Sequence, residues 1–202
     1  MQLVSPHYLF AERPPWAILF WLGFAGLFFV SSLAQRRDRT GAKGENRDRG
    51  SKVAIYLFSF AAFGCAFWAP AVLPQAHIAL PAEVVFAAAM AALWSGLLLY
   101  SWAVQTLGAF FRTSVTLLDG QKLVTKGPYR LLRHPAYTGG ILIFSGIGIA
   151  TGNWVSAIGS MLLVTLAYAW RIHVEERALS ERFGAEFEAQ RRRTWAVIPL
   201  VW

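Results

Sequence analysis

The sequence predicts an all-α, polytopic membrane protein with five transmembrane helices, and two observations carry this prediction. Only 15% of the 202 residues are charged and 56% are hydrophobic, whereas soluble domains carry about 25% charged residues. A water-soluble domain of this size could not bury so much apolar surface, which excludes that class. The charges are also unevenly placed, because five windows contain no Asp, Glu, Lys or Arg: residues 16–34, 53–73, 84–104, 136–152 and 154–170.

Each window has the length of a membrane span. The windows contain 17 to 21 residues, and about 20 helical residues cross a hydrocarbon core. The fourth and fifth windows are joined by a short polar turn at Thr151, Gly152 and Asn153. This turn predicts a helical hairpin, in which small residues allow close approach of the two backbones. The small residues are Gly139, Gly140, Gly146, Gly148, Ala157, Gly159 and Ser160.

The cationic residues predict the orientation. Residues 35–52 hold seven Lys and Arg against three acidic residues, and only Arg13 precedes the first window. By the positive-inside rule, this loop is cytoplasmic and the N-terminus lies outside. Alternation of five spans then places residues 105–135 and the C-terminus in the cytoplasm, so 18 of the 19 cationic residues lie inside.

Several other classes of protein and site are not expected. The cationic residues flank apolar windows and form no groove-reading motif, so nucleic acid is not an expected partner despite the net charge of +8. Residues 1–12 lack the basic start and cleavage site of a signal peptide. No Cys/His spacing indicates a metal site, and the single cysteine, Cys65, is expected as a small buried hydrophobic residue.

The C-terminal half is predicted to hold the functional core. Residues 105–135 mix apolar and polar residues with turn signals, and residues 173–193 have the pattern of an amphipathic cytoplasmic helix. We therefore divide the chain into a three-span region with a basic loop, residues 1–104, and a core, residues 105–202. Leu179, Phe183 and Phe187 share one face of the predicted helix, and Gly184 interrupts that helix. Pro199 is predicted to end any helix that follows.

Ionisable residues gather where the last two windows meet the cytoplasm. Pro135 is placed as the first-turn residue of the fourth helix, so His134 lies at the partly positive N-terminus, which favours an anionic group. The fifth window is followed by Arg171 and, one turn later, Glu175. Such a set could receive a zwitterion, for example an amino acid moiety. A surface ion pair between Arg171 and Glu175, and a structural role for His134, remain open alternatives.

The combined motifs resemble the isoprenylcysteine carboxyl methyltransferase family, which is grouped with the phospholipid methyltransferases among integral-membrane methyltransferases. The resemblance covers residues 107–202. The first three windows resemble the family only in being apolar membrane spans. The motifs are Gly127-Pro-Tyr129-x3-Arg133-His134-Pro135-x-Tyr137-x-Gly139, then Glu175-Glu176-x2-Leu179-x3-Phe183-Gly184, then Arg193-x5-Pro199.

The resemblance implies S-adenosylmethionine as methyl donor, with S-adenosylhomocysteine as product. It makes residues 105–202 a methyltransferase core with a cofactor loop, a helical hairpin over residues 136–170 and a C-terminal helix. It also assigns Arg171 to the orientation of a substrate carboxylate. The implied cofactor contacts are Thr116, Gln121, Lys122, Leu123, Val124, Tyr129, His134, Pro135, Ala136, Tyr137 and Glu175.

The chemistry implied by the resemblance needs no general base. A carboxylate acceptor is already ionised at neutral pH, so catalysis would depend on alignment and exclusion of water. Two positions depart from the family pattern, because Tyr100 stands where an arginine is usual and Phe187 where a tyrosine is usual. Because Tyr100 replaces a cationic residue, one of two cationic partners of the acceptor is lost. This departure affects the predicted acceptor more than the predicted cofactor.

The sequence thus predicts a multi-pass methyltransferase that methylates a carboxylate on a lipophilic or prenylated acceptor, in contact with membrane lipids. Its composition indicates a bacterial cytoplasmic membrane with a cytoplasmic active site, and an internal eukaryotic membrane is the alternative. A phospholipid or small-lipid N-methyltransferase is the second hypothesis, although Arg171 would repel a cationic headgroup. A transporter or scaffold is third, because no charges lie in the spans.

Overall fold

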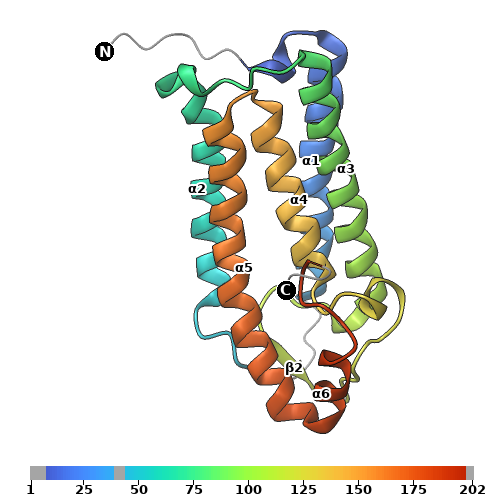
Figure 1. Ribbon diagram of the computed structural model, residues 1–202. Helices are drawn as coiled ribbons and strands as arrows, with labels where there is room; N and C mark the ends of the chain where they lie inside the picture. The colour runs from blue at the N-terminus through green and yellow to red at the C-terminus, as the bar shows by residue number, and fades with distance from the viewer. Residues whose placement is uncertain (1–7, 39–43, 199–202) are drawn as a thin grey trace.

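The computed structural model describes residues 8–38 and 44–198, which form a bundle of five long helices with a smaller cap at one end (Figure 1). The remaining described elements are short. The long helices are α1 (Pro14–Asp38), α2 (Ser51–Val72), α3 (Ala82–Leu107), α4 (Pro135–Ala150) and α5 (Trp154–Phe183). The short elements are η1 (Leu9–Ala11), β1 (Gly44–Asn46), η2 (Pro74–Ala76), η3 (Gly108–Phe110), β2 (Thr116–Leu118), η4 (Gly127–Arg130) and α6 (Ala185–Arg191).

Four of the five predicted spans are confirmed as helices long and apolar enough to cross a membrane: α1, α2, α3 and α5. The window at residues 136–152 forms α4, a shorter apolar helix of 16 residues. Sixteen helical residues rise about 24 Å, against a hydrocarbon core of about 30 Å. The protein is therefore an integral membrane protein with four candidate spans, and a fifth crossing by α4 stays a prediction.

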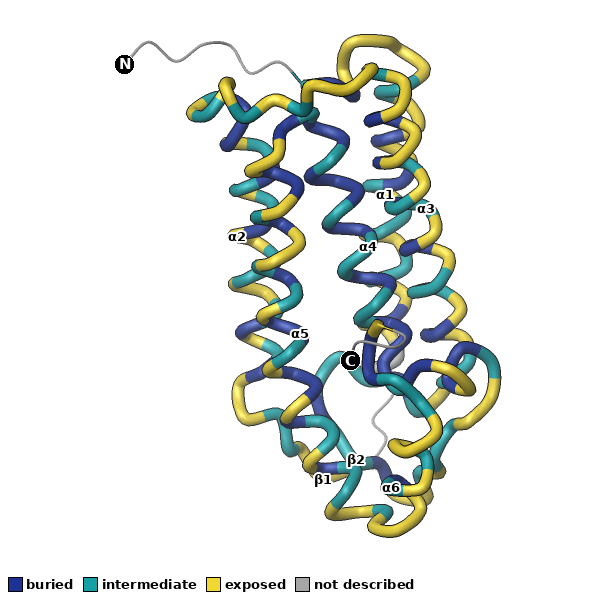
Figure 2. Tube along the Cα trace, viewed as in Figure 1, coloured by how far each residue is buried: buried dark blue, intermediate teal, exposed yellow. Residues whose placement is uncertain are grey.

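Helix α4 lies in the middle of the bundle, and most of its residues are buried (Figure 2). It packs against α3 on one side and α5 on the other, while α2 packs along α5 and α1 along α3. The turn between α4 and α5 is as predicted: Gly152 has a positive φ of 77°, and the Asn153 side chain caps α5 by accepting hydrogen bonds from its first N–H groups.

The prediction that the small residues join α4 to α5 is only partly right. Gly148 does face the backbone of α5, at Ser156 and Ala157. Gly139 and Gly146, however, face the backbone of α3, and the Ser160 hydroxyl donates to a carbonyl of α2. Spacing identifies a face of small residues, but it does not identify which neighbouring helix occupies that face.

We expect Gly139→Val to lower the thermal stability of the detergent-solubilised protein markedly. A Cβ at position 139 would lie 2.7 Å from the Gly96 carbonyl oxygen and 2.8 Å from the Tyr100 nitrogen, so two backbones must separate. Overpacking of this kind costs about 1–3 kcal/mol or more. Gly64→Ala is the matched control, because nothing lies within 4 Å of its added Cβ. Equal melting temperatures for both variants and wild type would contradict the close α3–α4 contact.

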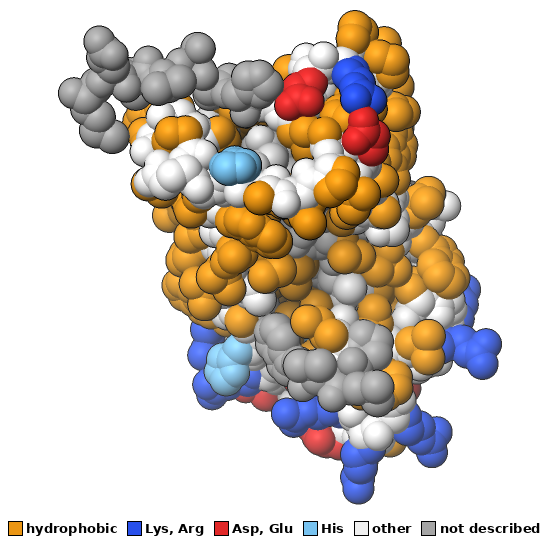
Figure 3. Space-filling model, turned by 45° about the horizontal axis from the view of Figure 1, so that its top comes forward, with side chains coloured by type: hydrophobic (Ala, Val, Ile, Leu, Met, Phe, Trp, Pro, Cys, Tyr) orange, Lys and Arg blue, Asp and Glu red, His pale blue; other side chains and the backbone are white. Residues whose placement is uncertain are grey.

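The connections α1–α2 and α3–α4 and the end of α5 lie at the same end of the bundle (Figure 1). There β1 pairs antiparallel with β2, with Asn46 opposite Thr116. The all-α prediction needs this correction, because three-residue strands are too short to give a sequence pattern. In Figure 3, the Lys and Arg side chains gather mainly at this end, while apolar side chains cover the helices.

The predicted cytoplasmic helix over residues 173–193 is not a separate element. Helix α5 continues without a break from the apolar window to Phe183. Gly184 then adopts a positive φ of 51°, as its predicted role as an interruption requires, and α6 follows in a new direction. Pro199 lies outside the described residues.

Candidate functional site

A cavity of about 360 Å³ lies where the N-terminus of α4, the middle of α5 and the loop before η4 meet. Nine of the eleven predicted cofactor residues line it, although they come from five different segments of the chain. These nine are Thr116, Gln121, Leu123, Val124, Tyr129, His134, Ala136, Tyr137 and Glu175.

Two predicted cofactor residues are not brought into the cavity wall. Lys122 is exposed on the loop, where its neighbours Gln121 and Leu123 face the cavity instead. Pro135 is fully buried as the first residue of α4, where its fixed φ starts the helix. Pro135 therefore helps to fix the neighbouring side chains without lining the cavity itself.

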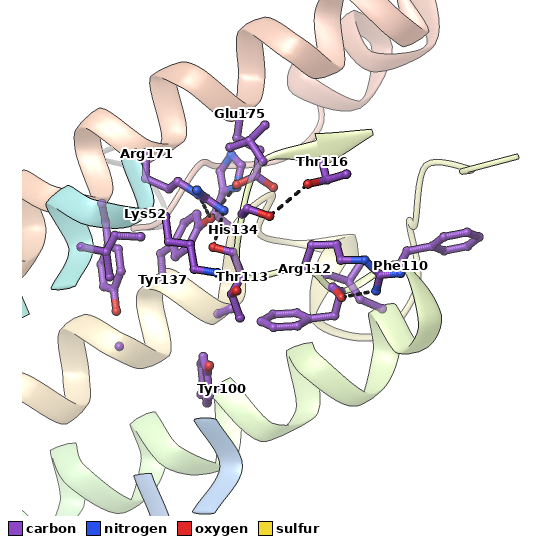
Figure 4. Close-up of a pocket in the computed structure, with 18 of the residues that line it drawn as sticks. Lys52, Tyr100, Phe110, Arg112, Thr113, Thr116, His134, Tyr137, Arg171 and Glu175 are labelled. Carbon is purple, nitrogen blue, oxygen red and sulfur yellow. Dashed lines mark hydrogen bonds and ion pairs between the residues drawn. The ribbon is translucent and has the colours of Figure 1, made fainter. Parts of the chain in front are cut away.

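The Glu175 carboxylate is the acidic group of the site that is open to the cavity. Its side chain is 31% exposed, and its Oε2 accepts a hydrogen bond of 2.6 Å from the Tyr137 hydroxyl. The Tyr137 hydroxyl in turn accepts one of 3.1 Å from Arg171 Nε. Figure 4 shows Arg171, Tyr137 and Glu175 close together on one side of the cavity. The carboxylate is thus held by one oxygen in a position suited to an ammonium group.

Arg171 does not form the surface ion pair that helix spacing allowed. The residue is 2% exposed, and its guanidinium pairs with Asp48, from the loop before α2. It also donates to the Ser51 hydroxyl at 2.8 Å and to the Thr113 carbonyl at 3.0 Å. With the bond to Tyr137, four of the five guanidinium N–H groups donate to protein acceptors.

A second ionic cluster supports the start of α4. Glu176 Oε1 lies 2.7 Å from Arg133 Nε and 3.2 Å from His134 Nε2. The backbone N–H groups of Arg133 and His134 donate to the carbonyls of Trp195 and Ala196. These two N–H groups are therefore already paired with the C-terminal segment, and the binding of an anionic group at the N-terminus of α4 stays a prediction.

Tyr129 closes the cavity beside Glu175. The residue is 7% exposed, and burial, with the nearby negative charge of Glu175, raises the pKa of its hydroxyl above the usual range. Both effects disfavour a phenolate. Tyr129 therefore presents a neutral aromatic side chain to whatever occupies the cavity.

The cavity continues into an apolar part at the depth of the helices. Residues of α1 and α2 line this part, and two of them, Phe28 and Tyr56, are 53% and 51% exposed. Tyr100 lies apart from the ionic cluster, on the α3 side of this region (Figure 4). Its wall includes Leu27, Phe28, Ser31, Ile55, Tyr56, Ser59, Phe63, Tyr100, Ile143 and Phe144.

Sequence reasoning missed Asp48, Ser51 and Thr113. The basic loop at residues 35–52 served only to predict the orientation, so none of its residues was expected in the site. A signal was nevertheless present: an Asp followed by a Ser directly before an apolar run is typical of a helix start, where polar side chains have fixed positions. It does not show that the same Asp reaches Arg171, 123 positions away.

The comparisons with known proteins show which family the chain resembles. The family model "Phospholipid methyltransferase" matches residues 84–186, about half of the chain. Protein-S-isoprenylcysteine O-methyltransferase B of Arabidopsis thaliana is 32% identical over 108 residues, which cover 52% of this chain and 55% of that protein. Protein-S-isoprenylcysteine O-methyltransferase of Schizosaccharomyces pombe is 31% identical over 109 residues, or 47% and 46% of the two chains.

The chain therefore spans about half the length of the curated relatives it matches. A solved eukaryotic intramembrane Ras methyltransferase, isoprenylcysteine carboxyl methyltransferase, shares the fold with a TM-score of 0.63 at 20% identity, over 98% of this chain and 72% of that one. These matches confirm the resemblance drawn from the motifs and its placement among methyltransferase-like membrane proteins.

Proposed function

The chain belongs to the phospholipid methyltransferase family, and we propose that it transfers a methyl group from S-adenosylmethionine to a carboxylate on a lipophilic, isoprenylcysteine-like acceptor. The single observation that carries this proposal is the cavity, in which an ionic cluster and an apolar region adjoin. A polar methyl donor and a lipid-borne acceptor need both kinds of surface. The curated relatives named above are isoprenylcysteine O-methyltransferases, which favours this acceptor class.

The residues fit the proposed cofactor. The amino acid part of S-adenosylmethionine carries an ammonium group, and the Glu175 carboxylate, which is held by Tyr137, lines the cavity. Leu123 and Val124 give apolar contacts beside Tyr129. The volume of about 360 Å³ lies in the range of ligand sites, about 300–1,000 Å³. When bound, the cofactor supplies an electrophilic methyl group.

The protein's contribution is alignment and shielding. A carboxylate acceptor is ionised at neutral pH and needs no base, so the fixed walls of the cavity provide the rate advantage by holding the reacting groups in line. The apolar region between α1 and α2 admits the acceptor's lipid chain from the bilayer. Arg171, at the cavity wall, orients the carboxylate. The cationic end of the bundle faces the cytoplasm.

One observation favours a second candidate, an N-methyltransferase acting on a lipid amine. Asp48 neutralises Arg171, so the repulsion of a cationic headgroup is weaker than the sequence implied. An amine must lose a proton before attack, and Glu175 or His134 would have to accept it. Analysis of the phospholipid headgroups in cells with and without the protein separates the two candidates.

The proposal is tested with purified protein in detergent or nanodiscs. Isothermal titration with S-adenosylhomocysteine should give saturable binding at one site. Labelled S-adenosylmethionine should then transfer its methyl group to N-acetyl-S-farnesylcysteine as a base-labile ester. A protein that binds no S-adenosylhomocysteine would overturn the cofactor assignment. A protein that binds it but labels only amino lipids would favour the second candidate.

A further inference from the structure

Asp48 links the first cytoplasmic loop to the centre of the site. Its carboxylate forms an ion pair with Arg171, and the two side chains are 12% and 3% exposed. Removing two charges from water is unfavourable unless the geometry of the pair is well satisfied. This buried ion pair joins two segments that are far apart in sequence. We therefore expect Asp48 to do more than add a charge to the surface.

Asp48 is itself held rigidly. Its Oδ1 accepts hydrogen bonds of 3.1 Å from the Val115 N–H and from the Ser51 hydroxyl, and its Oδ2 accepts one of 3.0 Å from the Lys52 N–H. Burial opposes ionisation, but these donors and the charge of Arg171 hold the pKa of Asp48 below its usual range. Asp48 is therefore a fixed carboxylate at neutral pH.

The backbone on both sides of Asp48 is tied to the segment that leads to the cofactor loop. The Asp48 N–H donates to the Asn46 side chain, and Asn46 pairs with Thr116 in the β1–β2 ladder. The Arg47 N–H donates to the Val115 carbonyl at 2.8 Å. Residues 46–48 are thus fixed relative to the cavity wall, where Thr116 and Val115 lie.

Arg171 connects the fixed Asp48 carboxylate to Glu175 through the Tyr137 hydroxyl. Its guanidinium lies between Asp48 on one side and the Tyr137 hydroxyl on the other, and that hydroxyl donates to Glu175. An arginine side chain loses rotamer entropy when its guanidinium is held in one orientation. A fixed counter-charge reduces the orientations open to the guanidinium.

We propose that Asp48 is a positioning residue for methyl transfer, which holds the Arg171 guanidinium, and through Tyr137 the Glu175 carboxylate, in the orientation that the reaction requires. The proposal rests on the proposed function, because it assigns Arg171 to the acceptor. Asp48 acts through Arg171 and does not itself contact either reactant. Through Asp48, the basic loop is then part of the active site.

The test compares Asp48→Asn with Glu45→Gln. Both remove one negative charge from the same loop, but Glu45 is exposed and pairs with Arg47. We expect Asp48→Asn to lower kcat 10- to 100-fold with KM for the acceptor raised less than fivefold and the affinity for S-adenosylhomocysteine within threefold. Glu45→Gln should keep wild-type kcat. Asp48→Glu should restore part of the lost kcat, which a mere loss of folding would not predict.

A double-mutant cycle shows whether Asp48 acts through Arg171. In the Arg171→Lys background, Asp48→Asn should lower kcat less than twofold further, since coupled residues are non-additive. Multiplicative losses would overturn the proposal, as would unchanged kcat for Asp48→Asn. If Asp48→Asn does not fold, Ser51→Ala is the second variant, because it removes one acceptor of the same guanidinium nitrogen. We expect Ser51→Ala to lower kcat about threefold. An unchanged kcat in Ser51→Ala would overturn the proposal. A wild-type protein that methylates no carboxylate would instead overturn the proposed function.

Discussion

Replacing Glu175 by glutamine is expected to weaken S-adenosylhomocysteine binding roughly 30- to 150-fold, because a hydrogen bond to a charged group is worth about 2–3 kcal/mol at such a site. Glutamine keeps the size of the side chain and can still accept from the Tyr137 hydroxyl, as Glu175 does. The change therefore removes the charge that an ammonium group would meet, with little effect on the walls of the cavity. Isothermal titration of the detergent-solubilised variant measures the difference.

Glu186→Gln is the matched control for this prediction. Glu186 is exposed at the start of α6, within the cap at the same end of the bundle. It should bind S-adenosylhomocysteine as the wild type does, and both variants should melt within a few degrees of it. An unchanged affinity in Glu175→Gln would show that the ammonium group, or the cofactor itself, binds elsewhere.

The second large effect concerns Arg171. We expect Arg171→Lys to lower methyl transfer at least 100-fold while the affinity for S-adenosylhomocysteine stays within threefold. A lysine keeps the charge, but it cannot supply the planar fork that reaches Asp48, Ser51 and Tyr137 together. Initial rates with N-acetyl-S-farnesylcysteine and titration with S-adenosylhomocysteine give the two quantities separately.

Arg171→Ala should behave differently from Arg171→Lys. It leaves the Asp48 carboxylate unpaired in a site where it is 12% exposed, and breaking a buried pair costs about 3–5 kcal/mol. We expect a lower melting temperature as well as lost activity. If Arg171→Lys lost cofactor affinity in the same proportion as activity, Arg171 would belong to the cofactor site and not to the acceptor.

The long helices could be predicted because hydrophobic length is a one-dimensional property of the chain. Four of the uncharged windows are confirmed as candidate spans, and Gly152 and Gly184 end or redirect helices as their types predict. Sequence alone could not decide whether α4 crosses the membrane, because sixteen apolar residues are compatible both with a short span and with a buried helix. That choice depends on how α3 and α5 enclose α4.

The site could be predicted only where its residues share a local motif. His134 and Tyr137 lie one turn apart at the start of α4, and both line the cavity with Glu175. Asp48 could not be placed, because its contact with Arg171 depends on the pairing of two strands of three residues each. The pairing of the His134 N–H could not be predicted either, because its acceptor lies in the C-terminal segment.

The strand pair β1–β2 also bears on how the chain can be recombined. It joins the loop after α1 to the segment after α3, while α2 packs on α5 and α3 on α4. Helices α2 and α3 therefore share surfaces with the last two helices. A chimaera that took residues 1–104 from one relative and the rest from another would have to inherit matched surfaces on both sides. Homologous exchange should succeed only when the loop carrying Asp48 travels with its partner segment.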